Sequence, residues 1–172
     1  HNIPFHLLVK NIKKYALEHK LSIQESARNI RYDFFNSLLE PFNYQYIVTA
    51  HHLQDNIETF FIHLNRGAGL KGLSGVPSVR DKVIRPLLSA SKNSIIEYAT
   101  LFKVKYSEDS SNKEFKYDRN YIRNIILPAI NNRFPDFDKA VQSSISAIKE
   151  DHSLLMSFIN EKIKPLVTQK NN

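Results

Sequence analysis

The sequence predicts an α/β domain in which helices flank a parallel β-sheet. Two runs, Phe5–Val9 and Tyr44–Ala50, are short and rich in apolar, β-branched or aromatic residues, which is typical of buried strands. A segment with apolar residues at helical spacing follows the second run directly and the first run after a short interval. Parallel neighbouring strands need a long crossover, usually a helix, so the order strand, helix, strand, helix favours a parallel sheet.

The two helices that follow these strands have recognisable start and stop signals. Ser22 and Glu25 have the spacing of a capping box, and we expect the helix that they begin to end at Pro41. The next helical pattern begins at His52 and is expected to end at Gly67, because glycine readily adopts the left-handed conformation that closes a helix.

The middle of the chain is expected to be a long loop followed by a helix and a strand. Residues 66–88 are rich in glycine, proline and basic residues, with Val83–Arg85 as one brief strand. Loops of this length inside a compact domain are usually functional. Ser91 is expected to cap the next helix, and Val104–Tyr106 to form another strand.

The last third is expected to be helical. Asp118 caps a helix that Pro128 would kink or end, because proline lacks a backbone N–H and its ring clashes with the preceding turn. Beyond Pro135 lies a long amphipathic helix whose apolar face must pack on this domain or on another one. We therefore divide the chain into a catalytic-type domain, residues 1–130, and a helical appendage, residues 131–172.

Composition places the chain among globular domains with a basic surface. It has 172 residues, 42% of them hydrophobic, and a formal charge of +7. The excess lies in residues 66–123, with twelve basic and six acidic side chains, whereas residues 1–65 are balanced. Clustered Lys and Arg indicate a polyanionic partner such as a nucleic acid or nucleotide, although a solvated basic surface gives the same pattern.

Some classes of protein are excluded or disfavoured by absences from the sequence. There is no cysteine, so disulfides, thiolate metal sites and cysteine nucleophiles are ruled out. No apolar run approaches the roughly 20 residues that span a bilayer, and no secretory signal is visible. We expect a cytoplasmic protein without a membrane partner.

A first polar cluster follows the predicted strand at Tyr44–Ala50. Helical spacing would place His51 and Asp55 on one face, and it allows His52 to meet Asp55 as well. Ligands of open α/β sheets bind at the carboxyl ends of strands. A His–carboxylate pair there can bind a divalent ion, transfer a proton or hold a phosphate through Mg²⁺. The alternatives are a helix N-terminus that carries only capping residues, and a metallohydrolase, for which no further ligands have typical spacing.

Two further clusters are candidates for anion binding. All four glycines lie between Arg66 and Gly75, where backbone N–H groups could approach an anion, but the spacing fits neither a dinucleotide fingerprint nor a Walker motif. The alternative interpretation of this glycine-rich segment is a flexible connector. Arg119 and Arg123 share a helix face and together suit phosphate; the alternative is salt bridges to Asp118 and Asp109.

The three clusters in this order resemble those of the tRNA(Ile)-lysidine synthetases, a branch of the PP-loop (N-type) ATP pyrophosphatases. The resemblance covers essentially residues 1–160, and the combination AHHxxDxxET, RGxGxxGL, EDxSN and RNxIR is highly specific. The matching stretches are SIQESARNIRYDFF, YIVTAHHLQDNIETFFIHLNRGAGLKGLSGVP, VIRPLL, YSEDSSN, YDRNYIRNIILPAI and NNRFPDFDKA.

The resemblance implies a Rossmann-like parallel sheet, incomplete at its N-terminus, and a two-step reaction. ATP would adenylate the wobble cytidine of a CAU anticodon in tRNA(Ile), and free lysine would then displace AMP. The implied catalytic residues are His51, His52, Asp55, Arg119 and Arg123, with Asp55 also a candidate Mg²⁺ ligand. The implied substrate- and nucleotide-binding residues are Glu58, Thr59, Arg66, Gly67, Gly69, Lys71, Gly72, Asp109, Asn112 and Asn120.

The sequence departs from the family pattern in one respect. The family places an SGGxDS loop after its first strand, and no such run occurs here. We therefore expect the chain to be part of a longer protein, without the C-terminal tRNA-binding region of longer members, and inactive by itself. PP-loop thiolases are disfavoured because they depend on cysteine. A non-catalytic basic RNA-binding module remains the alternative, and a homo-oligomer is left open.

Overall fold

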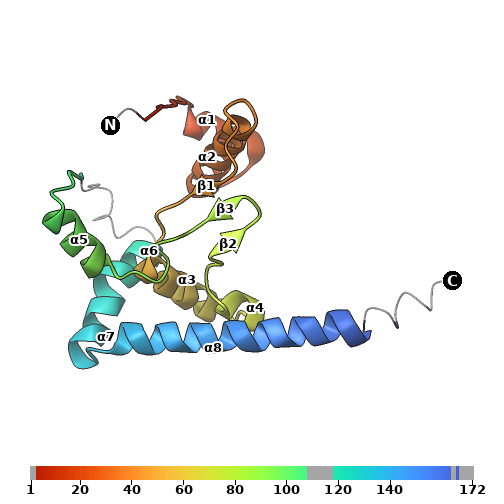
Figure 1. Cartoon of the computed structure of the whole chain (residues 1–172), viewed down its shortest axis with the longest axis vertical. Coiled ribbons are helices and arrows are strands. Elements are labelled where there is room, and N and C mark those ends of the chain that lie inside the picture. The colour runs from red at the N-terminus through yellow and green to blue at the C-terminus, as the bar shows by residue number, and fades with distance from the viewer. Residues whose placement is uncertain (1–2, 108–117, 164–165, 167–172) are drawn as a thin grey trace. The chain divides into compact units, whose positions relative to one another are not determined.

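The computed structural model describes residues 3–107, 118–163 and 166 of the chain (Figure 1). It divides into two compact units. The first contains residues 1–48 and 81–84, and the second contains residues 49–80 and 85–172. None of the helices in the described ranges is long and apolar enough to cross a membrane.

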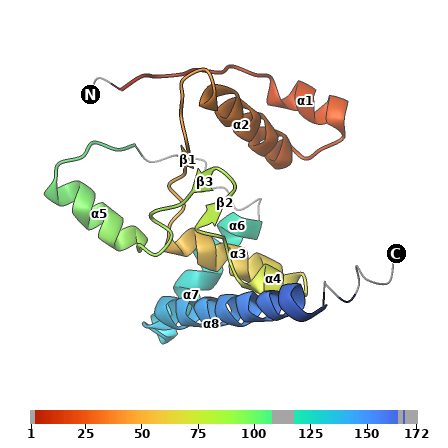
Figure 2. The same ribbon diagram turned by 45° about the vertical axis from the view of Figure 1, so that its right-hand side comes forward.

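The first unit is built on a pair of helices, α1 (Ile12–His19) and α2 (Ile23–Leu39), which lie side by side in Figures 1 and 2. The predicted capping box at the start of α2 is confirmed. Ser22 Oγ accepts a hydrogen bond from the Glu25 backbone N–H at 3.2 Å, and Glu25 Oε2 accepts one from the Ser22 N–H at 3.1 Å. The helix ends two residues before Pro41, as expected.

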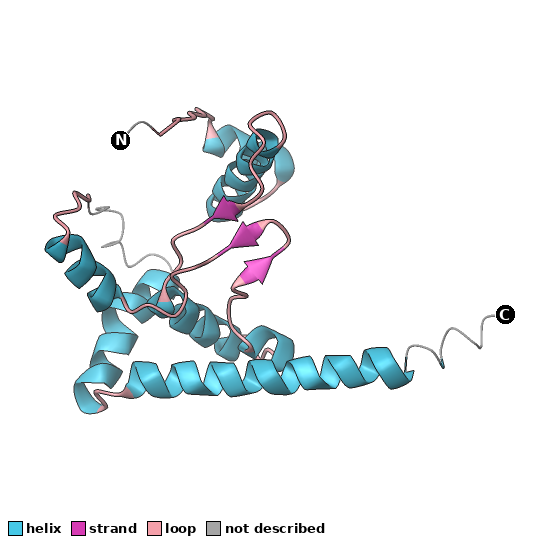
Figure 3. Cartoon of the chain, viewed as in Figure 1, coloured by secondary structure: helices cyan, strands magenta, loops and turns pink. Residues whose placement is uncertain are grey.

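A small sheet is drawn in magenta in Figure 3. Its strands are β1 (Ile47–Val48), β2 (Val79–Arg80) and β3 (Val83–Ile84), in the order β1-β3-β2. β1 and β3 are parallel, with Ile47 opposite Val83 and Val48 opposite Ile84. Ile47 and Val83 are buried together with Leu39 of α2. The predicted strand at 44–50 is therefore present but shorter, and the brief strand at 83–85 is confirmed except for its last residue.

Two predicted strands are wrong. Residues 5–9 and 104–106 carry strand-like sequence but form neither strand nor helix. The side chains of Phe5, Leu7 and Val9 are 73–84% exposed. Apolar composition makes a strand only when a neighbouring backbone supplies the ladder of hydrogen bonds, and no such ladder forms at either segment. The described fold is thus mixed α/β and mostly helical, and its Rossmann-like arrangement stays a prediction.

The second unit is helical, and α8 runs alongside α3 and α4 in both views (Figures 1 and 2). The predicted helix from His52 to Gly67 is confirmed as α3. The helical elements of the second unit are α3 (Leu53–Asn65), α4 (Leu70–Leu73), α5 (Lys92–Leu101), α6 (Asp118–Tyr121), the π-helical segment η2 (Ile122–Ile126), α7 (Leu127–Arg133), α8 (Phe137–Phe158) and the π-helical segment η3 (Ile159–Ile163).

One apolar cluster joins the helices of this unit. Its buried members are Leu53 and Ile57 of α3, Ile122 of η2, Leu127 of α7, and Val141 and Ile145 of α8. Burying a side chain of this size stabilises the fold by about 1.5–3 kcal/mol. The N-terminal half of α8 therefore has its packing partner within this chain. The boundary at residues 130 and 131 stays a prediction.

Pro128 was expected to kink or to end its helix, and the end is wrong. The chain passes from η2 into α7, and Pro128 stands in the first turn of α7. In the π-helical segment the Leu127 N–H donates to the carbonyl of Ile122, five residues back. This change of register makes Pro128 behave like a residue at a new helix start, where a missing N–H costs little.

Gly75 lies between α3 and α8. Its φ is +72°, and a Cβ there would lie 2.5 Å from Asn56 Oδ1 and 2.9 Å from Ile145 Cγ2. The amide of Asn56 is held in place because its Oδ1 accepts a hydrogen bond from the Val76 N–H at 2.7 Å. Only glycine fits this position without movement of a helix.

We predict that Gly75→Ala lowers the free energy of unfolding by about 2–4 kcal/mol, from left-handed strain and overpacking together. Gly69→Ala is the matched control, because Gly69 has a φ of −78° and its Cβ would meet nothing within 4 Å. Urea denaturation of both variants measures the difference. Equal midpoints for the two variants would contradict the packing described here.

Candidate polar site at the start of α3

The candidate site begins where β1 ends. Residues 49–52 lead from the strand into α3, and the His51 Nδ1 lies 2.9 Å from Thr49 Oγ1. His52 is the N-cap residue of α3. Asp55 Oδ2 accepts a hydrogen bond from the His52 backbone N–H at 3.0 Å and lies 3.5 Å from His52 Nε2. The carboxylate is thereby fixed in the first helical turn, where the helix dipole favours negative charge.

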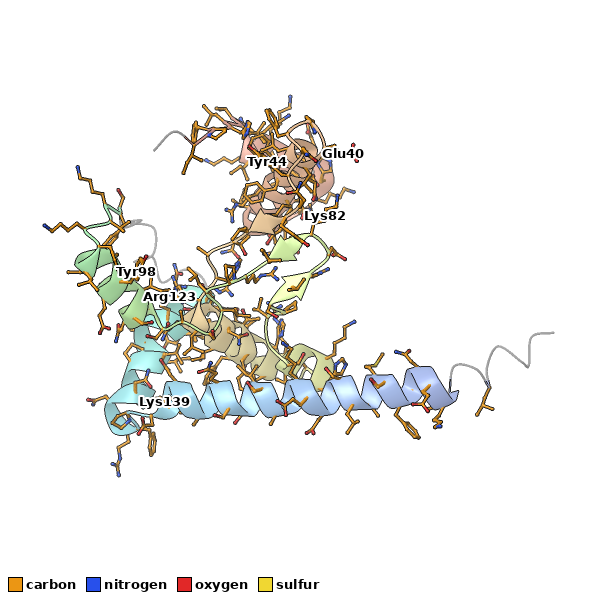
Figure 4. The ribbon with its side chains drawn as sticks, viewed as in Figure 1. Glu40, Tyr44, Lys82, Tyr98, Arg123 and Lys139 are labelled. Atoms are coloured by element: carbon orange, nitrogen blue, oxygen red, sulfur yellow. The ribbon has the colours of Figure 1, made fainter. Side chains whose placement is uncertain are left out.

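The centre of the site is an ionic cluster between α3 and the segment α6–η2. Glu58 is completely buried and accepts two hydrogen bonds from Arg123, Nε to Oε1 at 2.6 Å and Nη2 to Oε2 at 2.9 Å. Arg123 Nη2 also donates to Asp55 Oδ1 at 3.0 Å. Arg119 Nε lies 3.2 Å from Glu58 Oε2, and its Nη2 donates to Thr59 Oγ1 at 2.6 Å. Arg123 is labelled in Figure 4.

The charges in this cluster balance. Two carboxylates, Asp55 and Glu58, face two guanidinium groups, Arg119 and Arg123. Burial raises the pKa of Glu58 above its ordinary value of 4.5, and the Arg123 guanidinium opposes that rise. The hydrogen bonds that Arg123 donates to Glu58 in turn raise the pKa of Arg123. The buried charge of Glu58 is therefore held by its arginine partners, and these hydrogen bonds fix the geometry of the side chains.

The geometry bears on the alternatives left open by the sequence. The salt-bridge arrangement of Arg119 and Arg123 is the one seen, although its carboxylates come from Asp55 and Glu58 of α3. The expected proximity of His52 to Asp55 is also present. Thr59, one turn beyond Asp55, donates to the Asp55 carbonyl at 2.8 Å.

The glycine-containing segment lies at the other end of α3. The helix has 13 residues and so separates its two ends by roughly 18 Å. Gly67 has a φ of +66° just after the helix, and a Cβ on Gly72 would lie 2.5 Å from that of Ala68. These two glycines thus have structural reasons to be glycine. Arg66, Gly69 and Lys71 are exposed at this end.

The structure gives less information on the other residues that were predicted to bind substrate or metal. Asn120 lies on α6, next to Arg119. Asp109 and Asn112 fall outside the described residues. Among the described side chains, no group of three or more His, Asp or Glu could hold a metal ion. Both Asp55 oxygens accept N–H donors, so a Mg²⁺ role for Asp55 stays a prediction without support from its surroundings.

Sequence reasoning did not assign three polar residues that are held by specific hydrogen bonds. Gln54 Oε1 accepts a hydrogen bond from the Lys92 N–H at 2.8 Å, and its Nε2 donates to Asp138 at 3.1 Å, so it joins α3 to α5 and α8. Asn56 is buried against the loop after α4. Arg85 is buried as well. The only sequence signal for Arg85 was a charged residue inside the apolar run VIRPLL.

We predict that Arg123→Met destabilises the protein by about 3 kcal/mol at neutral pH, because it leaves Glu58 buried without its main partner. The pKa of Glu58 then rises further. A carboxyl group with a raised folded-state pKa contributes stability below its unfolded value, and that contribution is lost as pH rises through the folded value. The deficit should therefore be small near pH 4 and grow toward pH 7.

Denaturation curves between pH 4 and pH 8 measure this dependence. Arg133→Met is the control, since Arg133 is an exposed arginine whose guanidinium only lies over the Phe134 ring, 5.6 Å from its centroid. A deficit for Arg123→Met that does not change with pH would show that Glu58 is not the group left uncompensated.

Comparison with known proteins places the chain in a family. The sequence pattern of a family described as a PP-loop domain matches residues 2–130. The tRNA(Ile)-lysidine synthase of Photorhabdus laumondii is 40% identical over 151 residues, which cover 86% of this chain and 34% of that protein. The synthase of Chlorobaculum tepidum is 37% identical over 165 residues, covering 96% of this chain and 49% of that protein.

The synthase of Bacillus subtilis is 32% identical over 166 residues, covering 94% of this chain and 35% of that protein. The chain thus spans about a third to a half of the length of the curated relatives that it matches. The family pattern covers the strand β1, the helix α3 and both arginines of the ionic cluster. The chain belongs to the PP-loop domain family.

Proposed function

We propose that this chain carries the ATP-using part of a tRNA(Ile)-lysidine synthase. The observation that supports the proposal is the balanced cluster of Asp55, Glu58, Arg119 and Arg123, which follows β1 within the part of the chain that matches relatives bearing that name. The carboxyl ends of strands are where open α/β sheets bind their ligands. The substrates are ATP, free lysine and tRNA(Ile) with a CAU anticodon.

The proposed reaction has two steps. The C2 carbonyl oxygen of the wobble cytidine attacks the α-phosphorus of ATP, forming an O–P bond to AMP while pyrophosphate leaves. The ε-amino group of lysine then attacks C2, a C–N bond forms, and AMP leaves with the cytidine oxygen. The amine gives up its protons in this step, so a nearby base such as His51 or His52 is a suitable acceptor.

The ionic cluster suits charge stabilisation rather than proton transfer. Arg119 and Arg123 are held by Glu58 and Asp55, so their positions are set before a substrate binds. Preorganised guanidinium groups stabilise negative charge on phosphates without further reorganisation. Glu58, which is fully buried, acts as a positioning residue for both arginines. Asp55 is 17% exposed in its side chain and is the carboxylate better placed for a lysine ammonium.

The other predicted residues keep secondary roles in this proposal. Thr59 orients Arg119 through its hydroxyl group. Asn120, Asp109 and Asn112 are assigned to the substrate-binding side only by the family resemblance, as are the five residues between Arg66 and Gly72. Mg²⁺ would accompany ATP, held mainly by the phosphates. A homo-oligomeric state is compatible with the proposal but has no specific contact to support it.

The competing proposal is a basic RNA-binding module that performs no chemistry. It accounts for the excess of positive charge in residues 66–123. It does not account for the completely buried Glu58, because binding of RNA phosphates does not require a buried carboxylate between two arginines.

We predict that Asp55→Asn in the complete protein lowers lysine-dependent turnover roughly ten- to hundredfold, because a charge-assisted contact is lost while the size of the side chain is kept. Asp136→Asn is the control, since Asp136 is exposed and paired only with Lys139. Steady-state kinetics with ATP, lysine and tRNA varied separately measure the effect. Normal turnover of Asp55→Asn would reject this site. Tight tRNA binding without any tRNA-dependent pyrophosphate release from ATP would favour the RNA-binding module.

A further inference from the structure

Arg85 is a buried cation without a carboxylate partner among the described residues. It is 5% exposed. Its Nη1 donates a hydrogen bond to the Pro77 carbonyl at 2.7 Å, and its backbone N–H donates to the Ser78 carbonyl at 2.8 Å. Its Nε is buried and has no hydrogen-bond partner. One neutral carbonyl is thus the acceptor for a side chain that has five N–H donors.

Such an arrangement is unfavourable by itself. Buried charges in proteins are normally paired or bound to an ion of opposite charge, because desolvation costs several kcal/mol per ion. The guanidinium group cannot avoid this cost by losing its proton, since arginine stays protonated in proteins. The ionic cluster on α3 shows the usual solution, in which each arginine there faces a carboxylate. Arg85 differs from Arg119 and Arg123 because no carboxylate among the described residues faces it.

The position of Arg85 indicates what its partner would be. β1 and β3 are parallel, and Val48 lies opposite Ile84. Arg85 is the residue that follows β3, as Thr49 is the residue that follows β1. Thr49 contacts His51 of the candidate site. The segment after Arg85 also returns to α3, where the Leu53 N–H donates to the Ala90 carbonyl at 2.9 Å.

The residues around Arg85 leave it close to the surface. Pro77 and Ser78, whose carbonyls accept its two hydrogen bonds, are exposed, and so is Pro86, which follows it. Arg85 is therefore covered by a thin layer of loop rather than by the apolar cluster of the helices.

We propose that Arg85 binds a phosphate-type oxyanion beside the loop that carries Pro77 and Ser78. The planar guanidinium fork matches two phosphate oxygens, and its buried Nε is the donor left without an acceptor here. The proposal rests on the proposed function only for the source of the phosphate, which is either ATP and pyrophosphate or the backbone of RNA.

The test compares Arg85→Met with the wild type in the complete protein, by thermal unfolding with and without pyrophosphate. Without a ligand, Arg85→Met should unfold at the same temperature or higher, because an unpaired buried charge is replaced by an apolar side chain of similar length. Pyrophosphate at a hundredfold excess over its Kd should raise the wild-type Tm by about 5–10 °C. In Arg85→Met the apparent Kd should rise roughly ten- to hundredfold.

Two further variants sharpen the comparison. Arg85→Lys keeps the charge but loses the fork, so its affinity should fall between the other two. Lys82→Met removes one positive charge from an exposed side chain, labelled in Figure 4, and should leave the pyrophosphate shift unchanged. A general effect of net charge would instead weaken binding equally in both methionine variants and would overturn the proposal.

Titrations with ATP and with tRNA distinguish the two sources. Weaker binding of ATP and pyrophosphate alone assigns Arg85 to the nucleotide. Weaker binding of tRNA alone, with the salt dependence reduced by about one counterion, assigns it to the RNA backbone. If Arg85→Met is destabilised without ligand and binds all three as the wild type does, Arg85 is a structural link to Pro77 and the proposal fails. None of these readouts depends on turnover, so this outcome is separate from that of the proposed function.

Discussion

The pairing of Glu58 with Arg123 is the interaction on which the candidate site depends. A fully buried carboxylate is costly, and two short hydrogen bonds from one guanidinium group offset that cost. The same arginine then reaches Asp55, and Arg119 approaches from one turn earlier. A single buried charge in the middle of α3 therefore determines where three other charged side chains stand.

This ionic interaction is joined to the apolar core through neighbouring residues. Ile57 and Glu58 are consecutive on α3, and Ile122 and Arg123 are consecutive on η2. In each pair the apolar residue belongs to the buried cluster and the charged residue belongs to the ionic cluster. The π-helical hydrogen bonding of η2 widens the helix at this point, and such segments are frequent at functional sites. Packing and electrostatics thus align the same two helices.

Local signals in the sequence were enough to predict several elements. The capping box at Ser22 and Glu25, the helix between His52 and Gly67 and the brief strand near Val83 depend on neighbouring residues, and all three are present. The strand predicted at residues 5–9 was wrong, because strands require a partner that local sequence does not reveal. The end of a helix at Pro128 was also wrong, since the change to π-helical register upstream is not encoded by proline itself.

The candidate site was predictable in its members but not in their contacts. The spacing of Arg119 and Arg123 indicated a shared face, and the spacing of His52 and Asp55 indicated a contact. The pairing of those arginines with Glu58 joins residues 65 positions apart, and no periodicity specifies such a pair. Gln54 was not assigned because a glutamine on a helix carries no chemical signal until its partners on two other helices are known.

The separation between Glu58 and Arg123 also has a consequence during synthesis of the chain. A ribosome adds about 5–20 residues per second, so Glu58 is made roughly 3–13 s before the arginine that neutralises it. Until then α3 cannot bury its carboxylate at low cost, and Ile57 beside it also lacks Ile122 as a packing partner. The N-terminal half of the second unit must therefore remain open, with apolar surface exposed, until α6 and η2 have emerged. The helices that carry the cluster can complete their docking only when its second half, Arg119 and Arg123, has been made.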